Sequence, residues 1–311
     1  IKMIIHGTTL ATNAIIERKG AKTCFITTEG FRDDLDIGYE SRFDQYDILI
    51  EKTMSLVPRK YRYVIEERTD VNGSQIKPIN TTKFKKIIEK IKTENFESIG
   101  IGFLHSYANS KNENVLKKYI LENLPGVEVS ISSDVCPEIR EYERFTTTMI
   151  NAYIKPLMSN YLKKLDYELK EKGFNCPLLL MTSGGTLTNV SSACNNPVRL
   201  VESGPAGGAM LATSIAKDLN LNKVISFDMG GTTAKITIIE DKKAIKAREF
   251  EVDRKARFKK GSGFPLRIPV IEMVEIGAGG GSIARVNKLE QIITGPDSAG
   301  SVPGPACYSN G

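Results

Sequence analysis

The sequence predicts an α/β fold, and three features of its 311 residues predict it. Short apolar runs such as 98–104 and 127–132 alternate with segments whose apolar residues recur at helical spacing, as around Phe84 and Ile88. A long helical pattern runs from about residue 149 to 170 and crosses between the two halves of the chain. Glycine-rich turns follow several of the apolar runs, which is typical of sheets that bind ligands at their strand ends.

Length and composition fit a chain of two domains or of one large domain. The hydrophobic fraction of 41% and the charged fraction of 26% are ordinary for globular proteins. The net charge is only +6, and lysines are interleaved with acids, so we expect no nucleic-acid surface. The five cysteines are isolated and lack CxxC spacing, which argues against a zinc site or disulfide framework and favours a cytoplasmic location. No signal peptide is visible, and no apolar run approaches the ~18 residues of a membrane span.

The first elements predict one β-α-β unit of a parallel sheet. Strand-like Met3–Ile5 leads into the loop His6–Thr9, a helical pattern follows up to Gly20, and a second strand covers 22–27. The loop would then lie at the carboxyl end of a strand and the amino end of a helix, where anions bind. The alternative for His6 is a loop histidine bonded to the backbone.

Two further segments precede the long helix. Residues 29–75 are polar with scattered aromatic residues, which indicates an inserted excursion that covers the sheet or contacts a partner. Residues 138–148 hold three acids and two arginines, and we expect a solvated helix start with i,i+4 ion pairs.

A second helix start is predicted at residues 202–208. Pro205 in the first turn after Ser203 is a clear initiation signal. The neighbouring glycines, Gly204 among them, allow close helix packing. A hinge helix at a cleft between two lobes is the alternative interpretation.

The most informative stretch is a strand-turn-strand at residues 223–239. The turn holds two glycines and two threonines directly after Asp228. A strand follows the glycines, and this excludes the strand-loop-helix phosphate sites of the Walker and Rossmann type. Backbone N–H groups of Gly230 and Gly231, with the hydroxyls of Thr232 and Thr233, can instead wrap phosphate oxygens. Asp228 would face a bridging Mg²⁺ through water; the alternative is an ordinary hairpin with glycines at positive φ.

Another glycine run follows the strand pattern at 268–276. Gly279, Gly280 and Gly281 are consecutive, and their backbone can approach a flat ligand such as adenosine closely. The sequence therefore predicts a nucleotide site assembled from two glycine turns.

Eight runs together resemble the hydantoinase A / 5-oxoprolinase family, which includes N-methylhydantoinase A and acetone carboxylase-like ATPase subunits. They span nearly the whole chain in family order: His6–Ala14, Thr27–Arg32, Pro137–Arg144, Asn151–Tyr153, Ser203–Gly208, Asp228–Thr232, Ile276–Ile283 and Gly304–Tyr308.

The resemblance implies an actin/sugar-kinase/Hsp70-like ATPase fold with two ribonuclease H-like lobes that close on ATP and Mg²⁺. Residues 1–150 would be the remainder of the first lobe, with the inserted segment at about 29–75, and 151–311 the second lobe. The implied activity is ATP-dependent opening of a hydantoin or lactam ring by carbonyl phosphorylation. A hydantoinase B-type subunit would complete the ring opening, which makes the enzyme a hetero-oligomer.

The resemblance also assigns roles to the candidate site residues. Asp228, as the metal ligand, joins Thr232 and His6 as catalytic residues. The nucleotide-binding residues would be Gly230, Gly231, Thr232, Thr233, Gly279, Gly280, Gly281, Ser203 and Gly204.

The chain departs from the family pattern in two ways. The first phosphate loop, Asp-x-Gly-Gly-Thr-Phe-Thr-Asp, is absent, so the chain is interpreted as a fragment without that loop and without the carboxyl-terminal part, inactive alone. Lys235 stands where hydantoinases often carry Asp, and 272–275 also differ. Both features point toward the acetone/acetophenone carboxylase branch. A carboxylase ATPase subunit and a non-catalytic nucleotide-binding assembly module are therefore the alternatives.

Overall fold

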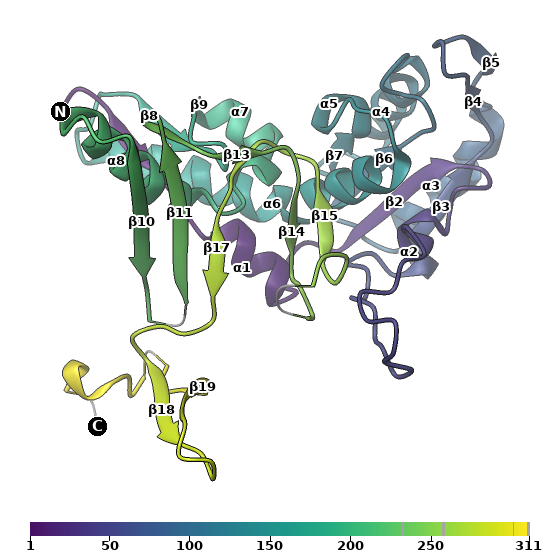
Figure 1. The fold of residues 1–311 in the computed structure, drawn as a ribbon. Coiled ribbons are helices and arrows are strands. Elements are labelled where there is room, and N and C mark those ends of the chain that lie inside the picture. The colour runs from purple at the N-terminus through teal and green to yellow at the C-terminus, as the bar shows by residue number, and fades with distance from the viewer. Residues whose placement is uncertain (232, 257–258, 301, 310–311) are drawn as a thin grey trace.

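The computed structural model describes residues 1–231, 233–256, 259–300 and 302–309. Figure 1 shows an elongated molecule with sheets at both ends and helices between them. Among the described residues, none of the helices combines the length and apolar character that crossing a membrane requires.

One end of the molecule is a four-stranded parallel sheet. Its order is β3 (Arg62–Ile65), β2 (Thr23–Thr28), β6 (Ser98–Gly102) and β7 (Glu128–Ile131). Every residue of β2 and β6 is buried, as expected for a parallel sheet covered on both faces. Helices α3 (Thr81–Thr93) and α4 (Lys111–Asn123) share an apolar core with one face. The alternating strands and helices predicted from 84 to 132 are confirmed.

The segment 29–75 is partly integral to this sheet, because it contains β3. Its other elements are short and lie at the periphery: α2 (Asp34–Ile37), the 3₁₀ turn η1 (Arg59–Tyr61), β4 (Arg68–Thr69) and β5 (Gln75–Lys77). The short helix α5 (Ser132–Val135) follows β7.

The predicted β-α-β unit at the start of the chain is wrong. Strand β1 (Ile4–His6) pairs in parallel with β8 (Leu178–Met181), which also pairs with β9 (Leu187–Asn189), and this sheet is separate from that of β2. After α1 (Leu10–Ile16) the chain crosses the long helix, where the Ala21 N–H donates to the Tyr153 carbonyl at 2.9 Å. A side chain at Gly20 would collide with the Tyr153 ring, so glycine permits the crossing. Strand β2 thus emerges on the far side of that helix.

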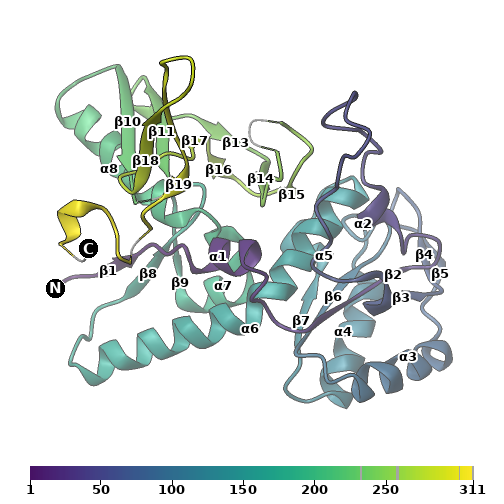
Figure 2. The same cartoon turned by 90° about the horizontal axis from the view of Figure 1, so that it is seen from below.

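The long helix α6 (Glu141–Glu171) connects the two ends, as predicted, with Pro156 inside it. It begins eight residues earlier than the apolar pattern indicated, and it packs on β6 and β7 as well as on α7 (Val190–Asn195) and the 3₁₀ turn η2 (Pro197–Leu200). In Figure 2, α6 runs from the four-stranded sheet at the right toward β1 and β8 at the left.

The other end is an antiparallel sheet built on the hairpin β10 (Lys223–Met229) and β11 (Ala234–Glu240). Strand β11 also pairs with β12 (Lys243–Ala244) and β17 (Val274–Ile276). Helix α8 (Ser203–Asp218) packs against this sheet.

The remaining strands form small pairs. They are β13 (Lys246–Ala247) with β16 (Val270–Ile271), β14 (Phe250–Val252) with β15 (Phe264–Leu266), and β18 (Ser282–Val286) with β19 (Ile292–Ser298). Figure 1 shows β18 and β19 beyond the turn of the β10–β11 hairpin. The 3₁₀ turn η3 (Ala306–Tyr308) follows.

Candidate functional site

The β10–β11 hairpin has the predicted strand-turn-strand form. The register runs from Lys223 opposite Glu240 to Met229 opposite Ala234. The turn is closed by the Gly230 N–H, which donates to the Thr233 carbonyl at 2.9 Å. Thr232, a candidate catalytic and binding residue, lies outside the described residues.

The two glycines of this turn are not explained by backbone strain. Neither Gly230 nor Gly231 has a positive φ. The alternative of an ordinary hairpin whose glycines are needed for positive φ is therefore wrong. A Cβ built on Gly231 meets no described atom within 4 Å, and one on Gly230 reaches only the Thr233 carbonyl at 3.7 Å. The turn therefore presents open backbone that the described chain itself does not occupy.

The downstream glycine run is hydrogen-bonded to this turn. Gly280 N–H donates to the Gly230 carbonyl at 2.9 Å, and Gly281 N–H to the Gly231 carbonyl at 2.8 Å. A Cβ on Gly281 would lie 3.0 Å from both the Gly231 oxygen and Ser298 Oγ. The Gly279 N–H donates to Ser282 Oγ at 2.9 Å. The structure thus brings together the two glycine turns that the sequence placed 50 residues apart.

Asp228 lies near the end of β10, on the face that packs against α8. Its Oδ2 is 3.7 Å from the position that a Cβ on Gly208 of α8 would take. The side chain is exposed, and within the described ranges it has no hydrogen-bond or ion-pair partner. No cluster of three metal-ligating side chains exists among the described residues. A lone free carboxylate fits Mg²⁺, which keeps several waters and takes its other ligands from phosphates.

A row of charges crosses the sheet from Asp228. Lys235 of β11 is directly opposite Asp228, and Glu275 of β17 is directly opposite Lys235, so all three side chains share one face. The Lys235 ammonium pairs with Glu202 and lies 3.8 Å from Glu275 Oε1. Glu202 precedes α8 with a φ of 62°, and its N–H donates to Thr12 Oγ1 at 3.1 Å.

From the sequence, Lys235 was recognised only as a departure from the family pattern. Neither Glu202 nor Glu275 was predicted to be a site residue. The signal that could have found the row is the strand alternation, because Asp228 and Lys235 flank the turn symmetrically. The pairing with β17 requires the fold.

The loop that holds His6 meets the start of α8. Thr8 N–H donates to Ser203 Oγ at 3.1 Å, and Ser203 Oγ donates to the Thr8 carbonyl at 2.9 Å. A Cβ on Gly7 would lie 3.3 Å from Gly204 Cα. Ser203 is fully buried, so its hydroxyl joins two parts of the chain.

His6 itself points to α6. Its Nε2 is 2.8 Å from the Tyr161 hydroxyl, and burial lowers the pKa of His6. The alternative interpretation of His6 was a loop histidine bonded to the backbone. Its partner in the structure is instead the side chain of Tyr161.

A cavity of about 550 Å³ opens beside the charged row. It lies between α1, the start of α8, the segment that begins with β14, and β17. Residues that line it include Thr12, Ile16, Glu202, Phe250, Met273 and Glu275.

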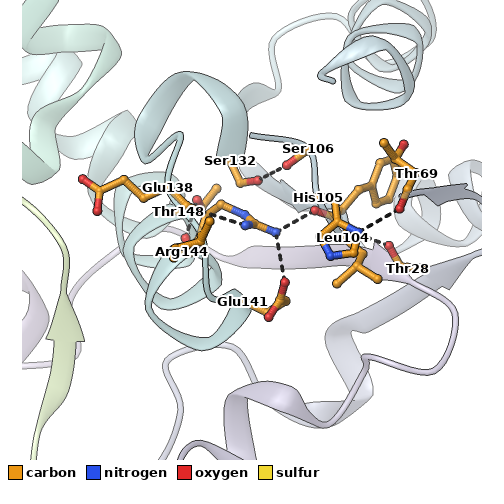
Figure 3. Close-up of polar contacts among 12 residues, drawn as sticks. Thr28, Thr69, Leu104, His105, Ser106, Ser132, Glu138, Glu141, Arg144 and Thr148 are labelled. Atoms are coloured by element: carbon orange, nitrogen blue, oxygen red, sulfur yellow. Dashed lines mark hydrogen bonds and ion pairs between the residues drawn. The ribbon is translucent and has the colours of Figure 1, made fainter. Parts of the chain in front are cut away.

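A second charged cluster, centred on Arg144, has a different character (Figure 3). The expectation that 138–148 is solvated is right only for 138–140 and wrong for the helix itself, because Arg144 is fully buried and Glu143 is 2% exposed. The Arg144 guanidinium donates to the Glu138 and Phe103 carbonyls, each at 2.9 Å, and lies 3.9 Å from Glu141. Residues 143–148 are buried because they pack on the end of β6. Among the described residues, Arg144 Nε and Glu143 Oε2 have no hydrogen-bond partner, and Glu143 pairs with Arg267 at 3.3 Å.

Family models match most of the chain. The model for the hydantoinase/oxoprolinase N-terminal region matches residues 1–124, and the hydantoinase/oxoprolinase model matches residues 144–311.

Individual relatives agree. An uncharacterized protein of Methanocaldococcus jannaschii is 44% identical over 100% of this chain and 47% of its own length. The caprolactamase subunit alpha of Pseudomonas jessenii is 32% identical over 99% of this chain and 43% of its own. The chain thus spans less than half the length of these curated relatives.

Two solved structures share the fold. The ATP-dependent caprolactamase of Pseudomonas jessenii has a TM-score of 0.81 at 30% identity, covering 99% of this chain and 44% of that one. Nucleotide-free acetone carboxylase has a TM-score of 0.76 at 25% identity, covering 95% and 42%. The fold is therefore the α/β fold of the actin-like ATPases. From the two model matches and these relatives, the chain belongs to the hydantoinase/oxoprolinase family.

Proposed function

We propose that this chain forms the nucleotide-handling part of an ATP-dependent enzyme that opens a hydantoin or lactam ring. The observation that carries the proposal is the turn at Gly230 and Gly231, which offers exposed backbone without any steric or conformational need for glycine within the described chain. Glycines of this kind let a ligand approach the backbone closely. The family match and the ATP-dependent relatives make a nucleotide phosphate the ligand that fits best.

In this proposal the turn wraps the phosphates through its backbone N–H groups, with hydroxyls of Thr232 and Thr233 as further donors. Asp228 holds Mg²⁺, which when bound neutralises phosphate charge during transfer. Gly279, Gly280 and Gly281 hold the turn in place and border the nucleoside. Ser203 and Gly204 fix the loop that carries His6, a residue we propose to act near the transferred group.

Phosphorylation of the carbonyl oxygen makes the ring carbon open to attack by water. We propose that a B-type subunit completes this hydrolysis in a hetero-oligomer. The subunit name of the caprolactamase relative supports an assembly of more than one kind of chain.

A carboxylase subunit is the second candidate, and the fold is compatible with it. The fold matches acetone carboxylase with a TM-score of 0.76, and the resemblance places Lys235 and 272–275 among the departures that point to the carboxylase branch. The nucleotide site would be the same, and only the activated molecule would differ.

Stimulated ATP hydrolysis by the full-length protein tests these alternatives. We expect hydantoin or ε-caprolactam to raise the rate, and acetone with bicarbonate to leave it unchanged. The reverse pattern would establish the carboxylase function. Failure of the full-length protein to bind ATP at all would contradict both and favour an assembly module.

A further inference from the structure

Lys235 has a carboxylate directly opposite it on each neighbouring strand. Asp228 faces it from β10, and Glu275 faces it from β17 on the other side of β11 (Figure 1). Directly opposite residues of antiparallel strands have Cβ atoms about 5 Å apart, so a lysine can reach either carboxylate. The ammonium nevertheless lies 3.8 Å from Glu275 Oε1, and in the described chain it forms no ion pair with Asp228. Strand register alone therefore does not decide which carboxylate it meets.

Glu202 supplies the deciding contact. Its carboxylate accepts a hydrogen bond from the Lys235 ammonium, and the two side chains are only 11% and 14% exposed. Glu202 directly precedes α8, whereas Asp228 lies against Gly208 within that helix. At about 1.5 Å per residue, these two positions are about 9 Å apart along the helix axis. The contact with Glu202 thus holds the ammonium near the start of α8 and away from Asp228.

The backbone of Glu202 has a conformation that favours glycine. Its φ is 62°, in the left-handed region, where a side chain is strained. Its N–H donates to Thr12 Oγ1 at 3.1 Å, which fixes the residue in this place. Strained residues are found at ligand sites where their side chains are needed. A glutamate here therefore indicates a task that glycine could not perform.

An ammonium paired with Asp228 would obstruct the proposed metal site. Lysine and Mg²⁺ bind the same carboxylate oxygens, so they compete for them. We propose that Glu202 is a positioning residue that holds Lys235 off Asp228 and so leaves this carboxylate free for Mg²⁺. The inference rests on the proposed function, because that function makes Asp228 the metal ligand.

Glu275 has a lesser part in this arrangement. Its carboxylate is beyond hydrogen-bond distance of the ammonium, and its side chain is 53% exposed. Exposed ion pairs contribute little, because water screens them. Glu275→Gln should therefore have a smaller effect on the metal site than any change at Glu202.

The test measures ATP binding by the full-length protein with and without Mg²⁺, by calorimetry and without any ring substrate. The readout is the ratio of the two dissociation constants, the Mg²⁺ enhancement, which does not depend on turnover. The variants are Glu202→Gln, Lys235→Met and the double variant that combines them. Glu240→Gln is the matched control, because Glu240 is an exposed carboxylate at the far end of β11. Melting temperatures show whether each variant is folded.

In wild type we expect an enhancement of about tenfold or more. In Glu202→Gln the ammonium is free to pair with its opposite neighbour Asp228, and this should lower the enhancement about fivefold. Lys235→Met and the double variant keep the wild-type enhancement, since neither has an ammonium that competes. Glu240→Gln also behaves as wild type. If Glu202→Gln does not fold, Glu202→Asp replaces it, and its shorter reach should lower the enhancement about twofold.

An unchanged enhancement in the folded Glu202 variant would overturn the inference and leave the proposed function standing. A double variant that stays low would also overturn it, because the loss would then not act through Lys235. So would a loss in Lys235→Met alone, since Lys235 would then itself support binding. If wild type binds no ATP or shows no Mg²⁺ enhancement, the proposed metal-phosphate site fails and this inference fails with it.

Discussion

Two charged regions of this protein differ in what they leave free. Arg144 and Glu143 are buried, and the Arg144 guanidinium is held by backbone carbonyls and flanked by the Tyr107 and Phe145 rings at 5.3 and 5.2 Å. Across the hairpin sheet, Asp228 is exposed with no partner in the described chain, and Glu275 is more than half exposed. The first region maintains the fold, whereas the carboxylates of the second are accessible to a ligand. Both regions hold acids and bases in the sequence, so burial and partners are what distinguish them.

The largest effect on stability should come from Arg144. Arg144→Met leaves the Phe103 and Glu138 carbonyls without their donor and uncouples Glu141, and we expect unfolding free energy to fall by about 3–5 kcal/mol. Urea unfolding measures it. Lys164→Met, on the exposed face of the same helix, is the control and should change stability by less than about 0.5 kcal/mol. Equal losses in both variants would show that the Arg144 cluster is not a structural unit.

Two glycines of the nucleotide site should separate stability from binding. Gly281→Val places a side chain against the Gly231 carbonyl and Ser298, and we expect a loss of about 1–3 kcal/mol. Gly231→Ala meets open space, so stability should change by less than about 1 kcal/mol. Its added methyl would occupy space proposed for phosphate, and ATP affinity should fall about tenfold or more. Unchanged affinity in Gly231→Ala would remove the main support for a phosphate turn.

A pH-dependent effect on stability is expected at Asp34, whose Oδ2 is buried without a hydrogen bond among the described residues. Burial first, and then Glu141 and Glu143, raise its pKa to about 6. Between the ordinary value of 3.8 and 6 the folded state binds more protons than the unfolded state, so stability falls as pH rises through this window. Asp34→Asn should therefore stabilise the protein by about 1 kcal/mol at pH 7 and by almost nothing at pH 4. Thermal melts at both values measure this, and a gain that is equal at both would show that ionisation of Asp34 is not its cause.

The sequence predicted the elements better than their assembly. Strand and helix periodicity identified β6, β7, β10, β11 and the body of α6, because local burial patterns produce these elements. It failed where distant contacts decide. Residues 143–148 carry a polar pattern but are buried by packing on the end of β6, and β1 and β2 separate because Gly20 lets the chain cross Tyr153.

The candidate site shows the same division. The phosphate turn was evident from Asp228 and the adjoining glycines, since local turn chemistry carries that signal. The bonds from Gly280 and Gly281 back to the turn, and the row from Asp228 through Lys235 to Glu275, depend on strand register between segments far apart in sequence. The periodicity of apolar residues within a segment does not show how that segment pairs with a distant strand.

The most direct test is titration of the full-length protein with ATP, with and without Mg²⁺, in wild type and Asp228→Ala. Because Asp228 has no partner in the described chain, its removal should leave the melting temperature unchanged. We expect Mg²⁺ to strengthen ATP binding about tenfold or more in wild type and to have little effect in Asp228→Ala. Equal enhancement by Mg²⁺ in both proteins would contradict the claim that this hairpin is the metal-phosphate site.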